Sequence, residues 1–344
     1  KNTFLYHIND GVTLQNEIIL LTEQLQQPFN TQTEVDVYIK NANSIFNKLM
    51  PHNIYEKLKG KKLTIAADGI IQNIPFEALI SNIDNQNSYL IKDNEINYVY
   101  SFSYLLSNSK KERNPEYTFL GFAPEQFQDK TLAVLPNSIT EITSINSIFS
   151  DKVFVKEQAS KLNFKSNFEN YKIVHLATHS GSSSSEKPWL AFSDEKVNLN
   201  EIYATHNQAD LVVLSACKTS QGELKTGEGV MSLARGFFFS GTNSVISTLW
   251  NINDKITEEI MHSFYTNLKN GETKSKALHK SKLDYLSANE GSMASPYYWS
   301  SFVLIGDSGI VSIGSKTNWV LLSILFVLVI VVGIFLKKRI TKHK

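Results

Sequence analysis

The chain has 344 residues, of which 42% are hydrophobic and 19% charged, a composition typical of a globular protein with room for a sizeable core or two lobes. Five of its 34 basic residues lie in the last eight. The remainder carries 29 basic against 33 acidic residues, which is not the charge pattern of a nucleic-acid-binding protein. The single cysteine excludes an intrachain disulfide and a cysteine-rich zinc site.

Residues 1–34 are polar and rich in Gln and Asn, so we expect a linker or the end of a preceding repeat region. A docking helix is predicted near residues 14–25. Because the sequence starts at Lys1 without a methionine, we expect that it is the C-terminal part of a longer protein.

An N-terminal lobe is predicted over residues 35–115. Apolar residues at helical spacing precede Pro51, which ends the helix that they predict. The Asp68-Gly69 pair is a strong signal for a hairpin turn after a first strand. A charged stretch at residues 108–114 is predicted to be an exposed linker to the next lobe. The elements expected in this lobe are a helix at 35–49, strands at 63–67 and 95–100, and a short helical turn at 74–79.

A second lobe is predicted over residues 116–307. Strands alternate with helices there, the order that a right-handed parallel α/β sheet requires. The sequence therefore predicts an α/β fold with a mostly parallel sheet flanked by helices, closed by a strand at 302–305. The other strands are expected at 117–122, 153–155, 173–177, 191–193, 211–216 and 243–249, and the helices at 139–149, 161–170, 199–204, 230–238, 256–268 and 274–287.

Two of these strands, residues 173–177 and 211–216, are continuous apolar runs that stop just before His179 and Cys217. Such runs indicate strands buried on both faces, and ligands collect at the carboxyl ends of strands in open parallel sheets. A thiol attacks as thiolate, and a neighbouring imidazole lowers its pKa and carries the proton, so the pair suits acyl transfer. The alternative is that Cys217 is a small buried apolar residue and His179 a loop histidine.

His175 lies four residues before His179, a spacing that places two metal ligands on one face of a helix. On a strand these positions are about 13 Å apart at about 3.3 Å per residue, too far to share one ion. The surrounding Ile-Val-His-Leu-Ala is strand-like, so we expect His175 to be a buried core histidine. We expect neither a metal nor a cofactor.

Several long blocks resemble, in the same order, the signature blocks of the CHAT domain family of caspase-like, separase-related cysteine peptidases, often found after tetratricopeptide repeats. The resemblance covers most of residues 35–307. It implies an α/β caspase-type fold with His179 as general base and Cys217 as nucleophile. The blocks read LTIAADGIIQNIPFEAL, HLATHSG, LSACKTSQGELKTGEGVMSLARGFFFSGTNSVISTLWNINDKIT and PYYWSSFVLIGD.

The sequence departs from the family pattern around the oxyanion hole. The resemblance implies donors from the amide of the nucleophile, Cys217, and from that of a glycine directly after the histidine, but here Ser180 precedes Gly181. Either Ser180 supplies its N–H or the glycine has moved by one position. After the nucleophile, Lys218, Ser220 and Gly222 stand where relatives usually have an acidic or variable residue, then Gly, then Gly, so the Ser for Gly exchange removes backbone freedom there. The Gly227-Glu228-Gly229 block is expected to form a turn and the charged start of a helix.

Asp254 resembles the acidic residue that lines the pocket for a basic P1 side chain in separase and CHAT proteins. A buried carboxylate holds a guanidinium through two charge-assisted hydrogen bonds. The alternative is that Asp254 caps the helix beginning near residue 256. Asp68 is a second candidate wall of this pocket, although a turn explains it more simply. Cleavage after Arg or Lys follows as a prediction.

Residues 317–336 are uncharged and strongly apolar, Trp319 stands near their start, and a basic cluster follows. This length spans a bilayer core of about 30 Å, and the flanking residues are typical interfacial anchors. We predict a linker at 308–316, a single membrane span at 317–336 and a basic tail at 337–344. The positive-inside rule places the C-terminus in the cytoplasm and the peptidase outside, with a cytoplasmic tail-anchored protein as the alternative.

We therefore expect a membrane-anchored cysteine endopeptidase that acts on a protein or peptide and is gated by upstream repeats or a regulatory protein. The Gly-Ser-Ser-Ser-Ser-Glu-Lys-Pro stretch after Ser180 is expected to form a loop that orders on binding. An inactive signalling or assembly scaffold on the same fold is the main alternative. A hydrolase of small esters is a weaker one, since no nucleophile-elbow glycine pattern surrounds Cys217.

Overall fold

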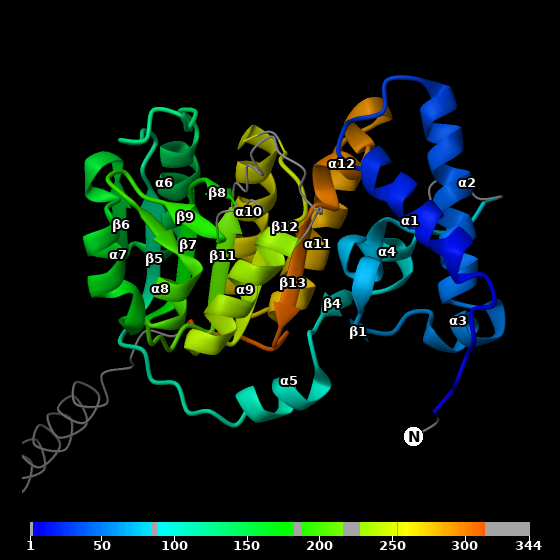
Figure 1. The fold of residues 1–344 in the computed structure, drawn as a ribbon, viewed down its shortest axis with the longest axis horizontal. Coiled ribbons are helices and arrows are strands. Elements are labelled where there is room, and N and C mark those ends of the chain that lie inside the picture. Colours follow the sequence, from blue (N-terminus) through cyan, green and yellow to red (C-terminus); the bar gives the residue numbers. More distant parts are fainter. Residues whose placement is uncertain (1–2, 84–87, 182–186, 216–227, 253, 314–344) are drawn as a thin grey trace, which may run out of the picture. The chain divides into compact units, whose positions relative to one another are not determined.

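The centre of the molecule is an eight-stranded sheet with the strand order β1-β4-β13-β12-β11-β7-β5-β6 (Figure 1). The computed structural model of the chain describes residues 3–83, 88–181, 187–215, 228–252 and 254–313, with the backbone alone for 228–232 and 254, and residues 1–311 form a single compact unit. The strands are β1 (Leu63–Ile65), β4 (Ile96–Tyr98), β5 (Tyr117–Ala123), β6 (Lys152–Val155), β7 (Tyr171–Ala177), β11 (Leu211–Ser215), β12 (Ser244–Thr248) and β13 (Phe302–Gly306).

The strands run in two groups of opposite direction. Strands β12, β11, β7, β5 and β6 are parallel to one another. Strand β13 is antiparallel to β12, and β4 and β1 follow it in parallel. The edge where β5, β7, β11 and β12 end is called the site edge below, and the edge where β13, β4 and β1 end is the opposite edge. The predicted mostly parallel sheet is confirmed, but β13 lies inside it rather than closing it.

Helices cover both faces of the sheet, as predicted for an α/β fold. One face is covered by α6 (Ser138–Phe149), α10 (Asp254–Lys269) and α11 (Lys274–Ala288), which pack in sequence against one another and against the strands. The other face is covered by α7 (Lys161–Asn167), α8 (Leu199–Tyr203) and α9 (Glu228–Ser240). Strands β7 and β11 are almost wholly buried between these layers, which explains their continuous apolar sequences.

The N-terminal residues form helices that belong to the same compact unit. The helix predicted near residues 14–25 is α1 (Gly11–Gln24), and its apolar stripe packs on α2 (Gln32–Leu49). Helix α2 begins with a capping box in which Thr31 and Glu34 satisfy each other's backbone N–H groups, and it ends just before Pro51. The smaller elements of this region are α3 (His52–Leu58), β2 (Ile80–Asn82), β3 (Ser88–Tyr89) and α4 (Leu90–Asp93).

The two predicted lobes share the central sheet, because β1 and β4 of the first continue it beyond β13 of the second. The chain therefore has no separate compact unit at residues 35–115. The segment predicted as an exposed linker is held at both ends. Helix α5 (Phe102–Asn108) ends at the buried Asn108, whose Nδ2 donates to the Thr242 carbonyl at 3.1 Å, and the Arg113 guanidinium donates to Gly241.

The hairpin predicted at Asp68-Gly69 is wrong. Strand β1 pairs with β4 in parallel, and the chain between them is far too long for a tight turn. The Asp68 side chain instead accepts a hydrogen bond from the Gly69 N–H at 2.8 Å and begins a 3₁₀ helix, η1 (Gly69–Asn73). The same residue pair suits both structures, because Asp caps a helix start as readily as it begins a turn.

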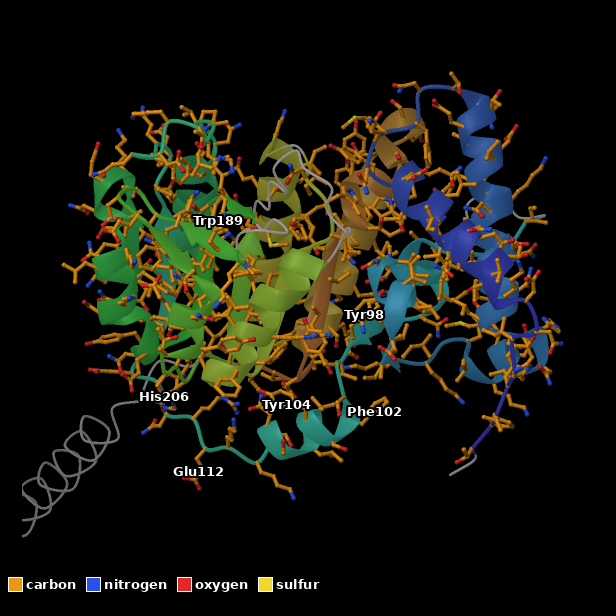
Figure 2. All side chains as sticks on the ribbon, viewed as in Figure 1. Tyr98, Phe102, Tyr104, Glu112, Trp189 and His206 are labelled. Atoms are coloured by element: carbon orange, nitrogen blue, oxygen red, sulfur yellow. The ribbon has the colours of Figure 1, made fainter. Side chains whose placement is uncertain are left out.

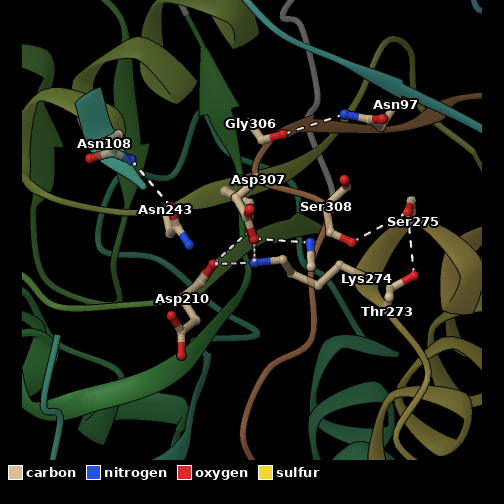
Figure 3. A network of polar contacts seen from close by, with 12 residues as sticks. Asn97, Asn108, Asp210, Asn243, Thr273, Lys274, Ser275, Gly306, Asp307 and Ser308 are labelled. Atoms are coloured by element: carbon tan, nitrogen blue, oxygen red, sulfur yellow. Dashed lines mark hydrogen bonds and ion pairs between the residues drawn. The ribbon is translucent and has the colours of Figure 1, made fainter. Parts of the chain in front are cut away.

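A polar network fastens the opposite edge of the sheet (Figure 3). The Lys274 side chain is fully buried, and its Nζ lies 2.9 Å from Asp307 Oδ2 and 3.3 Å from the Asp210 carbonyl oxygen. The Lys274 N–H donates to the Gly309 carbonyl at 3.0 Å. Asp210 precedes β11 and Asp307 follows β13, so this lysine joins the start of one strand to the end of another.

Within the described part of the chain, no helix combines the length and the apolar character needed to cross a membrane. The span predicted at residues 317–336 and the tail after it lie outside the described residues, so both stay predictions.

Candidate functional site

The strands that lead to His179 and Cys217 are direct neighbours in the sheet. Strand β7 pairs with β11 in parallel, and Ala177 at the end of one stands opposite Ser215 at the end of the other. The Thr178 N–H donates to the Ser215 carbonyl at 3.3 Å, so the two backbones stay together at the site edge. His179 follows Ala177 by two residues, as Cys217 follows Ser215, and Cys217 itself lies outside the described residues.

His179 is buried, and its ring is held from two sides. Its Nε2 lies 2.7 Å from the Ala133 carbonyl oxygen, and its ring centroid lies 5.0 Å from that of Phe127. A carbonyl oxygen only accepts hydrogen bonds, so Nε2 must carry the proton. In the neutral imidazole this tautomer leaves the lone pair on Nδ1.

The two ring contacts just described come from the loop between β5 and α6, residues 124–137, which sequence reasoning did not select. The loop packs through a small apolar cluster of Phe127, Leu135, Trp189 and Ala191. An ion pair of 3.0 Å between Asp129 and Lys196 joins it to the neighbouring small sheet. No motif marks this loop in the sequence, because its role depends on a backbone carbonyl that any residue provides.

The residues directly after His179 form a strand that was not predicted, β8 (Ser180–Gly181). It pairs with β9 (Trp189–Ala191), which pairs in turn with β10 (Lys196–Asn198). The Ala191 N–H donates to the His179 carbonyl at 2.9 Å. Hydrogen bonds alternate along an antiparallel pair, so Ser180 occupies the position between two of them and its N–H turns away from β9.

Gly181 faces the indole of Trp189, which stands at the site edge (Figure 2). A Cβ atom at position 181 would lie 2.5 Å from the Cζ2 atom of that ring. This close approach explains the glycine at position 181 without any role in catalysis.

His175 is a buried core histidine, as predicted. Its Nδ1 lies 2.9 Å from the Tyr265 hydroxyl, and its Nε2 lies 2.9 Å from Glu141 Oε1. Among the residues that the structure describes, no group of three or more His, Cys, Asp and Glu side chains is arranged to hold a metal ion.

The two acidic candidates have different outcomes. Asp254 is the first residue of α10, but its side chain is not described, so the P1 and helix-cap interpretations both stay predictions. Asp68 is exposed and follows β1 at the opposite edge, whereas His179 follows β7 at the site edge. The structure therefore does not bring Asp68 to His179, because β1 and β7 run in opposite directions.

Lys218, Ser220, Gly222 and Gly227 lie outside the described residues, while α9 begins at Glu228, where a helix start was expected.

Three hydroxyl groups near the end of β12 and the start of β13 are buried. Within the described residues, Ser247 and Thr248 at the end of β12 and Ser301 before β13 each have a buried hydroxyl without a hydrogen-bond partner. The Leu249 N–H donates to the Ser301 carbonyl at 2.9 Å, which keeps these residues together at the site edge. Buried polar groups without partners are uncommon in native proteins.

The chain is similar to several known proteins. Over 96 residues it is 32% identical to tetratricopeptide repeat protein 28 of Homo sapiens, a match covering 28% of this chain and 4% of that protein. The chain thus spans a small part of the curated relatives that it matches. Among solved structures, it is similar to the Saccharomyces cerevisiae separase–securin complex with 15% identity over 71% of this chain and 15% of that one (TM-score 0.45).

Two further solved structures are similar to the chain. Gingipain R of Porphyromonas gingivalis, an Arg-specific cysteine proteinase, has 10% identity over 87% of this chain and 74% of that one, with a TM-score of 0.47. Caspase-1 from Spodoptera frugiperda has 11% identity over 60% of this chain and 94% of that one, with a TM-score of 0.38. The CHAT domain model matches residues 40–307, which are most of the chain, so the chain belongs to the CHAT domain family.

Proposed function

We propose that the chain is a caspase-like cysteine endopeptidase in which Cys217 is the nucleophile and His179 the general base. The observation that carries this proposal is the pairing of Ala177 with Ser215 at the ends of two parallel strands. Each strand leads, two residues later, to one member of the dyad. The Nε2 hydrogen bond to Ala133 adds support, since it leaves Nδ1 as the basic atom.

In this mechanism the Cys217 thiol gives its proton to His179 Nδ1, and the thiolate attacks the carbonyl carbon of the scissile peptide bond. The C–N bond then breaks as Nδ1 returns the proton to the leaving amine, which leaves a thioester. Water, deprotonated by the same Nδ1, hydrolyses the thioester and regenerates the thiol. The Ala133 carbonyl stabilises the imidazolium form between these steps by accepting from Nε2.

We assign the oxyanion donors to the backbone N–H groups of Ser180 and Cys217. The position of Ser180 between two ladder hydrogen bonds, with its N–H turned from β9, supports Ser180 over Gly181. The glycine at 181 has a separate reason in the contact with Trp189. The departure from the family pattern is then a change of side chain rather than a loss of the donor.

For specificity, we propose cleavage after Arg or Lys with Asp254 as the acidic wall of the P1 pocket. The unpartnered hydroxyls of Ser247 and Ser301, on one face of the β12–β13 pair at the end of the strand that leads toward Asp254, are suitable additional acceptors for a cationic side chain. Asp68 has no part in this pocket.

We also propose that residues 317–336 anchor the protein in a membrane as a single span, with the basic tail in the cytoplasm and the peptidase on the other side. The curated relatives are tetratricopeptide repeat proteins, which supports regulation by a repeat region or a partner protein.

A thiol-reactive peptidyl probe with Arg at P1 tests the dyad. Because Cys217 is the only cysteine, any covalent labelling of thiol reports on it alone. We expect the wild type to be labelled, Cys217→Ala to be unlabelled, and His179→Ala to react much more slowly. His262→Ala, which changes an exposed histidine on α10, serves as the matched control. Equal labelling of His179→Ala and the wild type would contradict the dyad and favour the inactive scaffold.

A further inference from the structure

A buried carboxylate joins the two strands that lead to the dyad. Glu141 on α6 is only 3% exposed. Its Oε1 accepts a hydrogen bond from the Ser215 hydroxyl on β11 and lies 2.9 Å from His175 Nε2 on β7. His175 Nδ1 in turn lies 2.9 Å from the Tyr265 hydroxyl on α10. One oxygen atom thus contacts both strands of the pair.

The direction of each hydrogen bond in this network follows from the chemistry of its members. Burial raises the pKa of Tyr265 well above its ordinary value, so the phenol stays protonated, and it donates to His175 Nδ1 in the neutral imidazole tautomer that donates to Glu141 through Nε2. His175 then carries its own proton on Nε2 and donates to Glu141. The Ser215 hydroxyl donates to the same oxygen, so Glu141 is the common acceptor at the end of the network.

The network lies directly below the site edge. Ser215 is the last residue of β11 and precedes Cys217 by two residues. His175 lies on β7, four residues before His179. Ser215 is also the residue that pairs with Ala177. A shift in the bond between Ser215 and Glu141 would therefore move the end of β11 relative to β7.

Helix α6 holds Glu141 firmly against the sheet. The next residue, Ile142, packs so closely on β5 that a Cβ atom at Gly121 would lie 3.0 Å from its Cδ1. A carboxylate in this layer is costly to bury unless its hydrogen bonds are satisfied, and an apolar residue would be easier to accommodate. Its presence at this point is explained if it fixes the register of the two strands.

We infer that Glu141 is a positioning residue for the dyad, which holds the carboxyl ends of β7 and β11 in register through its hydrogen bonds to His175 and Ser215. This inference rests on the proposed function, because it concerns the distance between His179 and Cys217. Within the described residues, the side chain of Glu141 makes its hydrogen bonds to His175 and Ser215, so it acts through the two strands that carry them.

The test compares Glu141→Ala, Glu141→Gln and Ser215→Ala in the full chain. Alanine at 141 removes the acceptor, whereas glutamine keeps an acceptor oxygen and removes only the charge. Ser281→Ala is the matched control for Ser215→Ala, because Ser281 is a buried serine on α11, a helix that contacts β13 and β4, and its hydroxyl donates to the Leu278 carbonyl at 2.8 Å. Circular dichroism and thermal unfolding identify any variant that does not fold.

The first readout is the pH dependence of Cys217 alkylation by iodoacetamide, which needs no substrate. A free thiol has a pKa of about 8.5, and a neighbouring imidazolium lowers it. We expect the apparent thiol pKa to rise toward this value in Glu141→Ala and Ser215→Ala, and to stay near the wild-type value in Glu141→Gln and Ser281→Ala. In the second readout, kcat for an Arg peptide should fall by about 10- to 100-fold in the first two variants, with KM little changed.

The outcomes separate this inference from the proposed function. A wild type with an unperturbed thiol and no hydrolysis would overturn the proposed function itself. A reactive wild type whose thiol pKa and kcat survive in a folded Ser215→Ala would overturn the positioning role of the network. Equal losses in Glu141→Gln and Glu141→Ala would also overturn it, because the effect would then come from charge rather than from the hydrogen bonds.

Discussion

Replacing Gly181 by alanine should separate the oxyanion hole from the reactivity of the thiol. The added Cβ would lie 2.5 Å from Cζ2 and 2.9 Å from Cε2 of the Trp189 indole, closer than real side chains approach. Trp189 is 5% exposed and packs with Phe127 and Leu135, so the ring has little space to withdraw. The short strand β8 must move instead, and the Ser180 N–H moves with it.

The expected effect is large on turnover and modest on stability. Overpacking of this kind costs about 1–3 kcal/mol. Removal of one oxyanion donor lowers kcat by about 10²- to 10³-fold in other hydrolytic enzymes. We therefore expect a folded Gly181→Ala protein with a kcat reduced by about 100-fold.

The assay measures kcat and KM with a peptide substrate, together with the rate of Cys217 alkylation by iodoacetamide. Alkylation creates no oxyanion, so its rate should stay at the wild-type level. Gly11→Ala is the matched control, because nothing lies within 4 Å of a Cβ atom at that position. A Gly181→Ala enzyme with wild-type kcat would refute the assignment of the donor to Ser180.

Three further predictions concern the rest of the chain. Lys282→Met should lower the free energy of unfolding by about 3–5 kcal/mol in urea titrations, because the buried Glu77 would lose its 2.8 Å ion pair, and an unchanged midpoint would contradict this. Asp254→Ala should abolish cleavage after Arg and Lys while Cys217 stays reactive, and an unchanged P1 preference in a peptide library would exclude the P1 role. Burial raises the pKa of Asp307, but the charge and hydrogen bond of Lys274 outweigh it and hold the pKa below its ordinary 3.8. The stabilisation from this ion pair is complete above pH 3.8, the ordinary pKa of the carboxyl group. It is lost as the pH falls through the lower pKa that Asp307 has in the folded protein. Thermal unfolding of Asp307→Asn should therefore show a weaker pH dependence below about 4 than the wild type, whereas equal slopes would argue against the ion pair.

Much of the fold could be predicted from the local sequence pattern. Continuous apolar runs identified β7 and β11, and helical stripes identified α2, α6 and α10, because burial on one or two faces leaves a direct trace in residue order. The strand context of His175 likewise predicted a core histidine, and the structure confirms this with two hydrogen-bond partners.

The direction of β13 and the strand order were not predictable, because a strand has the same apolar pattern whichever way it runs. For this reason the sequence did not reveal that β13 is antiparallel to β12 or that β1 and β4 extend the same sheet. The local pair Asp68-Gly69 fitted two structures equally well, and the wrong one was predicted. The supports of His179 were also missed, since the Ala133 carbonyl and the ring of Phe127 meet it only through tertiary folding.

The antiparallel direction of β13 determines at which edge of the sheet the chain leaves this strand. The strand ends beside Asn243, whose carbonyl accepts from the Asp307 N–H, and the Gly309 carbonyl accepts from the Lys274 N–H at the edge where β11 and β12 begin. A label attached near this point would therefore sit at the edge of the sheet opposite to the ends of β7 and β11.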